Sequence, residues 1–396
     1  MSVDQTHETI GVRLARIRKR RGLTQHGLSQ RANYARSHIA QVEVGHKVAT
    51  PAFVAAVAAA LGVDPSELYG QPYMEDPRRT GVHTAITAIR RAMAHLDVGP
   101  DLDGPPRTLA RLQAEICVAL RLRHAARHAQ LAARLPSVIE ELTWHAYETE
   151  RPDAWRMLNR AHGLAASLTR RLGYNDLAAQ IMERAAASAR NSQDPHLPLM
   201  MTHRRALLMM NVAVCGPAVR LLERSVDQVD QRRPDAAEVA GSLHLRAAVI
   251  CARNRRASAA WDHYAQATEI SKAAGSPSLD EHGTDFNPGN IAVHGAAIAL
   301  ELGDLDEAAR RDRAIVRTTL AGLAAERRAH HELDMARVHV ETGAYGRALD
   351  RLLSAEKTAP QMARFHPTAH SVVDRLVDVH RTVPDPLRRL HTRMAR

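Results

Sequence analysis

The chain has 396 residues, which is enough for two or three domains, and 54 Lys and Arg against 43 Asp and Glu give it a formal net charge of +11. Aromatic residues make up only 3% of the sequence, which argues against a fold built on sheets and favours helices packed on helices. Cys117, Cys215 and Cys251 are widely spaced and form no C-x-x-C motif, so we expect reduced, buried thiols.

Two further features bear on where the chain resides. Residues 1–12 lack the charged start and apolar core of a signal peptide. The longest apolar run, residues 52–61, is too short to span a bilayer and is better interpreted as a buried helix. The sequence therefore predicts an all-α protein that is soluble, cytoplasmic and not associated with a membrane.

Residues 22–46, GLTQHGLSQRANYARSHIAQVEVGH, predict two short helices joined by a tight turn. Thr24 is a suitable N-cap for the first helix, and Asn33 tolerates the left-handed conformation that such a turn requires. The second helix, residues 35–44, ends at Gly45, where no Cβ opposes a positive φ. This pattern is typical of a helix-turn-helix, whose second helix enters the major groove of DNA.

Flanking helices complete a five-helix domain over residues 9–70. Apolar residues at helical spacing over 10–17 predict the first helix, and Pro51 and Pro65 each open a further helix at its first position. Residues 13–47 contain nine Lys or Arg and a single acid, so this segment carries +8 of the total charge. Such a concentration of positive charge favours a surface that faces DNA phosphates, and a nucleoid-associated protein.

This segment resembles the XRE family, the phage repressor and Cro type of DNA-binding domain. The matching features are Leu14 to Arg18 (LARIR), Gly22 to Gln25 (GLTQ), Ile39, Glu43, Gly45, Pro51, Leu61 to Val63 (LGV) and Leu68. Two positions depart from the family pattern: Gly27 replaces an acidic helix former and Ala35 replaces a Ser or Thr cap. Each departure is expected to weaken its helix by about 1 kcal/mol.

The resemblance implies specific roles in DNA binding. Arg36, Ser37 and Gln41 are expected to reach base edges, whereas Gln25, His38 and Lys47 are expected to contact or support contacts with phosphate. It also implies that Arg18 is structural and pairs with Glu43.

Residues 71–81 are expected to be a linker, and residues 97–106 a second one. Between them, apolar residues alternate at spacings of four and three over two heptads, namely Val82, Ile86, Ile89, Met93 and Leu96. This pattern predicts a helix over about 82–96 that either forms a dimer contact or packs on its own chain.

From residue 107 to 396 the pattern is that of repeated helix pairs. Gly343-Ala344-Tyr345, followed by small and apolar residues, resembles the turn and second helix of a tetratricopeptide (TPR) repeat. Equivalent alanines recur at separations of 40, 42, 48 and 40 residues, namely Ala178, Ala218, Ala260, Ala308 and Ala348. We therefore expect a TPR-like solenoid, with atypical helices over 107–150, a long loop over 275–290 and a capping pair over 361–396.

Motifs for catalysis or for a cofactor are missing. His124 with His128 and His366 with His370 have the spacing that places two ligands on one helix face, but no further ligand completes either pair. There is no H-E-x-x-H, Walker loop, G-x-G-x-x-G or nucleophile elbow. The sequence predicts neither an enzyme nor a metal or cofactor site.

The first helices of the repeats are expected to line the concave face of the solenoid. Positions 18, 15, 11 and 7 residues before the repeated alanines include Arg160, Arg171, His203, Asn211, Arg253, Asn290, His330 and Arg337. These basic and amide groups suit the backbone or carboxylate of a peptide, or another small anion. The alternative is that they are ordinary exposed residues of an arginine-rich chain.

Residues 286–294, FNPGNIAVH, resemble an F-G-P-T-N-x-x-x-H signature of regulators that combine these two domains, with Asn287 and Gly289 as departures. Asn290 and His294 lie four apart, and we expect Asn290 to project into the groove beneath the 275–290 loop. A capping or packing role is the alternative.

The whole chain resembles one-component regulators with an XRE domain and a TPR-like sensor, such as the peptide-responsive quorum-sensing group. This resemblance implies a homodimeric transcriptional regulator that binds a double-stranded DNA operator and responds to a peptide or small-molecule signal. The alternative is a TPR scaffold that docks a partner protein while bound to DNA. An XRE-fused hydrolase is disfavoured because the sequence has no metal motif.

Overall fold

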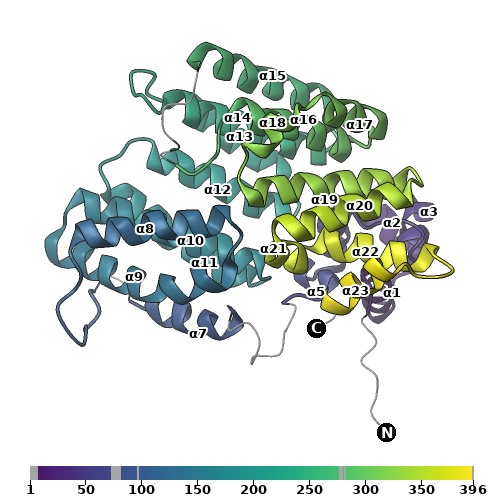
Figure 1. Ribbon diagram of the computed structural model, residues 1–396, viewed down its shortest axis with the longest axis horizontal. Helices are drawn as coiled ribbons and strands as arrows, with labels where there is room; N and C mark the ends of the chain where they lie inside the picture. Colours follow the sequence, from purple (N-terminus) through teal and green to yellow (C-terminus); the bar gives the residue numbers. More distant parts are fainter. Residues whose placement is uncertain (1–7, 73–81, 96–97, 276–279, 281, 395–396) are drawn as a thin grey trace, which may run out of the picture.

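The computed structural model describes residues 8–72, 82–95, 98–275, 280 and 282–394. Within these ranges it contains 22 helices and no strand (Figure 1), so the predicted all-α class is confirmed. Most of the predicted linker over 71–81, together with Leu96, Asp97 and Pro277, lies outside the described residues.

The N-terminal five helices form the helix-turn-helix (HTH) domain as predicted. They are α1 (Ile10–Arg20), α2 (Gln25–Ala32), α3 (Arg36–Glu43), α4 (Pro51–Leu61) and α5 (Pro65–Tyr69). Thr24 caps α2 by accepting a 3.0 Å hydrogen bond from the Gly27 N–H, and Asn33 has a φ of 52°. Gly45 follows α3 with a φ of 78°, whereas Ala35 forms no side-chain cap. Local capping and turn signals therefore determine this part of the fold.

The core of the HTH domain explains why α2 and α3 hold a fixed angle. Leu14, Leu28, Ile39, Phe53 and Leu68 are all fully buried and belong to one cluster. Burying each such side chain contributes about 1.5–3 kcal/mol. Helix α4 supplies much of this core, which confirms that the apolar run over 52–61 is a buried helix.

Helix α7 (Val82–Ala92) packs on α9 (His128–Thr149) of its own chain. Val82, Ile86 and Ile89 are at most 1% exposed in the same core as residues of α9. The interpretation of this apolar row as a dimer contact is therefore wrong, because the row is already covered.

The rest of the chain consists of helix pairs that stack side by side. The pairs are α8 (Leu109–His124) with α9, α10 (Pro152–Arg171) with α11 (Asn175–Asn191), α12 (Leu197–Asn211) with α13 (Cys215–Val226), α14 (Ala236–Arg253) with α15 (Ala257–Ala274), α16 (Pro288–Leu302) with α17 (Leu305–Ala314), and α19 (Ala325–Glu341) with α20 (Tyr345–Thr358). The five repeated alanines lie on the second helices of the last five pairs, and each is fully buried. A side chain no larger than a methyl group lets the paired helices approach closely, so the TPR-like repeat is confirmed.

Short helices interrupt and end this solenoid. Helix α18 (Arg317–Ala321) lies between α17 and α19 and was not predicted. Helices α21 (Pro360–Phe365), α22 (Pro367–Val379) and α23 (Asp385–Met394) follow α20, and α22 and α23 pack on it in the place of the predicted capping pair.

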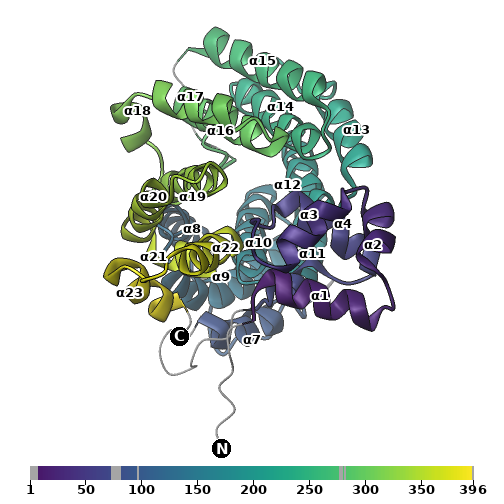
Figure 2. The same cartoon turned by 90° about the vertical axis from the view of Figure 1, so that its right-hand side faces the viewer.

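The solenoid curves until its two ends meet, and Figure 2 shows the helix pairs arranged around a ring. The Ala129 N–H donates to the Gln361 Oε1 atom at 3.1 Å, and Arg171 of α10 forms an ion pair with Glu326 of α19. Arg123, at the end of α8, donates to the Gly283 carbonyl at 2.9 Å. These contacts join segments more than 150 residues apart and enclose a central space.

The HTH domain lies against this ring rather than apart from it (Figure 2). Helix α4 packs on α12, and the Asn175 Nδ2 atom donates to Asp64 Oδ1 at 3.2 Å. The guanidinium carbon of Arg255 lies 4.7 Å from the centre of the Tyr34 ring. Val48, after α3, belongs to the apolar cluster of α19 to α23. The HTH domain therefore contacts the early, middle and last parts of the solenoid.

Two predictions made from composition are resolved by the structure. Cys251 is buried, but Cys215 is half-buried and Cys117 is exposed, so the expectation of three buried thiols is wrong. Cys117 follows the fully buried Ile116 on α8 and therefore points to the opposite, solvent side of that helix. Among the described helices, none combines the length and the apolar character needed to cross a bilayer.

Candidate functional site

The exposed face of α3 presents three of the predicted DNA contacts. Arg36, Ser37 and Gln41 are exposed although the HTH domain is docked on the solenoid. Ile39 and Val42 occupy the opposite face of the helix and are 0% and 2% exposed. The docked arrangement therefore leaves the predicted base-reading residues accessible.

The three residues predicted at phosphate have different surroundings. Gln25 is half-buried, and its Nε2 atom donates to Glu43 Oε2 at 2.9 Å. The His38 ring stacks on Phe53, with ring centres 5.0 Å apart and planes at 9°. Burial, with Lys47 and Arg255 nearby, lowers the pKa of His38 to about 4, so this ring is neutral at physiological pH. Lys47 is half-buried at the end of the α3 turn.

Arg18 and Glu43 form the predicted pair. The Arg18 Nε atom donates to Glu43 Oε1 at 2.6 Å, and the second guanidinium nitrogen donates to Oε2 at 2.8 Å. Their side chains are only 9% and 6% exposed. Burial opposes ionisation of Glu43, but hydrogen bonds from Arg18 and Gln25 outweigh it and hold its pKa below the usual value. The pair ties α1 to the end of the recognition helix.

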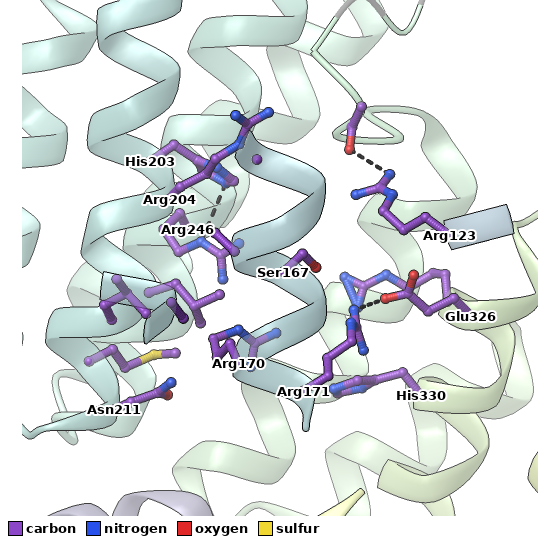
Figure 3. Close-up of a pocket in the computed structure, with 18 of the residues that line it drawn as sticks. Arg123, Ser167, Arg170, Arg171, His203, Arg204, Asn211, Arg246, Glu326 and His330 are labelled. Carbon is purple, nitrogen blue, oxygen red and sulfur yellow. Dashed lines mark hydrogen bonds and ion pairs between the residues drawn. The ribbon is translucent and has the colours of Figure 1, made fainter. Parts of the chain in front are cut away.

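A cavity of about 450 Å³ lies inside the ring, and Figure 3 shows side chains from several repeats pointing into it. The first helices α10, α12, α14, α16 and α19 supply most of its lining, as predicted for the concave face. The HTH domain contributes Pro51, Pro65, Tyr69 and Gln71. The cavity is thus shared between the solenoid and the HTH domain.

Most of the residues predicted for the groove line this cavity. They are Arg160, Arg171, His203, Asn211, Arg253, His294 and His330. Arg337 does not line it: this side chain is buried and directed to Glu301, with 3.4 Å between the guanidinium and Oε1. Asn290 does not line it either.

Asn290 corrects the prediction that it projects into the groove. Its side chain is 2% exposed, and its Nδ2 atom donates to the Thr284 carbonyl at 3.3 Å. Its backbone N–H donates to the Asn287 Oδ1 atom at 2.9 Å, which makes Asn287 the N-cap of α16. A residue within the first turn, whose amide secures the preceding loop, faces that loop rather than the cavity. The alternative of a packing role describes its place in this structure.

His294, one turn later, does reach the cavity, and its neighbours define its tautomer. Its Nδ1 atom lies 2.7 Å from the Asn290 carbonyl, which can only accept, so Nδ1 carries the proton. Its Nε2 atom is then an acceptor and receives a hydrogen bond from Arg327 at 3.1 Å. His203 is similar, because its Nε2 atom accepts from the Arg246 Nε atom at 3.3 Å. Burial lowers the pKa of both histidines well below the usual value, so both are neutral.

The cavity is strongly basic. Four carboxylates line it, those of Asp285, Glu301, Glu326 and Asp334. Eight arginines do so, namely Arg123, Arg160, Arg170, Arg171, Arg204, Arg246, Arg253 and Arg327. Since the lining histidines of known tautomer are neutral, this excess of arginine leaves a positive field in an enclosed space, where charges are weakly screened.

Sequence reasoning missed several of these arginines although a signal was present. The position 14 residues before each repeated alanine lines the cavity in all five repeats, as Leu164, Arg204, Arg246, His294 and Asp334. This position lies two helical turns before the one 7 residues from the alanine, so it shares its face. Arg123 and Arg327 lie near helix ends and had no repeat signal.

Burial and crowding act on the cavity arginines together. Arg253 lies 3.5 Å from Glu301, and Arg171 pairs with Glu326. Arg170 has no hydrogen bond or ion pair among the described residues. Burial, with Arg253 nearby, lowers the pKa of Arg170 to about 10, and burial with Arg327 nearby lowers that of Arg246 to about 9. Both groups remain charged at neutral pH.

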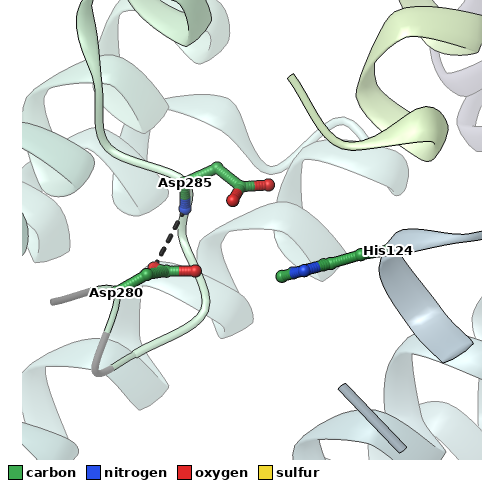
Figure 4. A group of neighbouring side chains, drawn as sticks. All are labelled: His124, Asp280 and Asp285. Carbon is green, nitrogen blue, oxygen red and sulfur yellow. Dashed lines mark hydrogen bonds between the residues drawn. The ribbon is translucent and has the colours of Figure 1, made fainter. Parts of the chain in front are cut away.

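The predicted histidine pairs do not form metal sites. His124 ends α8 and His128 begins α9, so the chain turns between them and they share no helix face. His128 is buried near Phe365, whereas His124 faces Asp280 and Asp285 (Figure 4).

Possible ligand atoms of His124, Asp280 and Asp285 lie within 4.8 Å of one another. However, the Arg123 guanidinium lies 2.6 Å from His124 Nε2 and would oppose a cation there. The second pair is also engaged, because His366 caps α22 and the His370 Nε2 atom lies 2.7 Å from the Arg364 carbonyl.

Comparison with known proteins agrees with the N-terminal assignment. Residues 9–68 match the family model described as a helix-turn-helix domain. Together with the geometry above, this match identifies the N-terminal region as an HTH DNA-binding domain. No curated protein matches the chain in sequence.

Two solved structures are similar over most of the chain. One is Bacillus thuringiensis PlcR in complex with the peptide PapR7 and DNA, at 14% identity, covering 85% of this chain and 99% of that chain with a TM-score of 0.34. The other is a point mutant of PrgX, at 11% identity, covering 85% of this chain and 100% of that chain with a TM-score of 0.34. At these scores neither structure assigns a ligand or a mechanism to this chain.

Proposed function

We propose that this chain is a sequence-specific DNA-binding transcriptional regulator whose solenoid binds a signal in the central cavity. The observation that carries the proposal is that the HTH domain forms part of the cavity wall, through Pro51, Pro65, Tyr69 and Gln71. A ligand in this cavity contacts the DNA-binding domain and the solenoid at the same time. The chain acts by binding, without catalysis or a cofactor.

The coupling follows from this shared wall. Tyr69 lies beside Arg253, Glu301 and Arg337, and its burial raises its pKa to about 12, so its phenol is neutral. A ligand that moves these groups changes the surface on which α5 rests. A ligand that binds better to one placement of the HTH domain shifts the population toward that placement. Such coupling is typically 1–3 kcal/mol, or about 5- to 150-fold in affinity.

The DNA-bound form is proposed to be a homodimer. In such a dimer the two recognition helices lie ~34 Å apart, so that they enter successive major grooves on one side of the duplex. Because α3 remains exposed while docked, the signal is proposed to act through the spacing of the two HTH domains rather than by covering α3.

Arg36→Ala tests the DNA contact. Arg36 is expected to pair with a guanine in the major groove and to give ~1–3 kcal/mol of discrimination. Selection of bound sequences from random DNA should therefore show relaxed preference at one base pair in each half-site. Unchanged preference with uniformly weaker binding would show that Arg36 contacts phosphate instead.

Native mass spectrometry of the chain purified from its own cells tests the signal-binding role. A retained small molecule or short peptide is the expected result, since the cavity of about 450 Å³ accommodates ligands of that size. A stoichiometric protein partner would instead identify a scaffold. A chain that carries nothing, and whose affinity for DNA does not respond to cell extract, would contradict the proposal.

A further inference from the structure

We infer that the cavity binds a compact oxyanion with at least two negative charges, such as a phosphate ester or a polycarboxylate, through Arg170, Arg246 and Arg327. The inference rests on the proposed signal-binding role and names the chemical class of the signal. It follows from the charge, the hydrogen-bond donors and the size of the cavity.

The first step is that these three guanidinium groups lack a matching carboxylate. Arg170 has no ion pair among the described residues, and the Arg246 Nε atom donates to a neutral histidine, His203. Arg327 likewise donates to His294 at 3.1 Å. Each charge is therefore buried or half-buried without a carboxylate partner of its own, an arrangement that costs free energy until an anion binds.

The second step is that the three charges act on one another. Arg170 and Arg327 both lower the pKa of Arg246, as like charges do when they are close in a poorly hydrated space. A single monovalent anion leaves part of this repulsion uncompensated. An anion with two or more charges offsets it and can receive forked hydrogen bonds from more than one guanidinium.

The third step is an excess of N–H donors in the lining. The Nδ1 atom of His203 carries the proton, because Nε2 accepts from Arg246, and it has no acceptor within the described part of the chain. The Nε atoms of Arg123 and Arg171 are also buried without an acceptor there. A wall rich in donors matches a ligand rich in acceptor oxygens, whereas the amide groups of a neutral peptide bring as many donors as acceptors.

The test uses the full chain, with inorganic pyrophosphate and citrate as probes and sodium chloride at matched ionic strength as the control. Thermal unfolding should show a saturable rise of the midpoint with one or both probes and no comparable rise with chloride. Pyrophosphate and citrate separate phosphate from carboxylate recognition. A midpoint that responds to ionic strength alone would overturn the inference.

Matched variants locate the site. R246Q and R170Q should each weaken probe binding by about tenfold or more in calorimetry, since each removes a charge-assisted contact. Without the probe, both should unfold at the wild-type temperature or above it, because like-charge repulsion is relieved. R205Q is the control: Arg205 neighbours Arg204 on α12 but is exposed and pairs with Glu183 on the outside. Equal probe binding by R246Q, R170Q and R205Q would overturn the inference.

This inference can fail while the proposed function stands. A neutral or cationic molecule retained by the native chain would overturn the oxyanion assignment and still support a signal-binding cavity. A chain that binds no probe and retains no molecule contradicts both.

Discussion

At the scale of single residues, the buried Arg18–Glu43 pair is the clearest case of a side chain in a basic segment that does not face DNA. Glu43→Ala leaves Arg18 buried without its partner, so the free energy of unfolding should fall by about 3 kcal/mol. Chemical denaturation of the full chain measures this change. Glu8→Ala is the control, because the pair of Glu8 with Arg16 is 32% and 40% exposed and should contribute under about 1 kcal/mol. Equal losses for both variants would contradict the structural role of Glu43.

His38 makes a prediction about pH. Its pKa is about 4 in the fold, below its ordinary value of 6.5, because it is buried against Phe53 with positive charges nearby. A lowered histidine pKa means that the stability it contributes is present above pH 6.5 and is lost as the pH falls toward 4. His38→Phe keeps the ring stack without the titrating group, so its stability relative to wild type should increase as the pH falls from 7 to 5. A constant difference over this range would show that the ring is hydrated and free.

His38 also illustrates the limit of family resemblance. The sequence position predicts a residue that assists at phosphate, but the described contacts are with Phe53, Tyr34 and the charge of Arg255 from the solenoid. Resemblance gives the position in the motif. It does not show that another part of the chain covers that position.

At the scale of elements, the segment that leads into α16 is held by one close contact. A Cβ atom added to Gly241 of α14 would lie 1.9 Å from the Phe286 ring, so only glycine allows this approach. Gly241→Ala should displace Phe286 and lower the free energy of unfolding by about 1–3 kcal/mol. Gly346→Ala, on α20, is the matched control, because its Cβ would meet nothing within 4 Å. The control should be neutral or stabilising by up to about 1 kcal/mol. A similar outcome for both in urea denaturation would contradict this account of the 286–294 signature.

The elements themselves were largely predictable, for local reasons. Thr24, Asn33 and Gly45 carry capping and turn signals that act within a few residues, so α2 and α3 begin and end close to the predicted positions. The repeated alanines likewise mark helix crossings within each pair. The side chains that line the cavity were harder to predict, since they depend on the phase of each helix. Asn290 was misplaced because a capping turn changes which way the first residues of α16 face.

At the scale of the whole molecule, the docking of the HTH domain on the ring had no signal in the sequence. The hydrogen bond from Asn175 to Asp64 joins residues 111 apart, and the contact of Arg255 with Tyr34 depends on two exposed side chains meeting across domains. Closure of the ring through Arg171 and Glu326 is of the same kind. Such contacts arise from the accumulated curvature of the repeats, which small rotations between helix pairs determine.

The most direct test of the central claim is the affinity of the full chain for its selected operator, with and without the molecule released from the natively purified chain. We expect this ligand to change the Kd by about fivefold or more in the wild type, and R246Q to lose the change while it still binds the operator. By linkage, operator DNA should change the ligand's affinity by the same factor. An operator affinity that is identical with an empty and a filled cavity would contradict the proposal that the cavity controls the HTH domain.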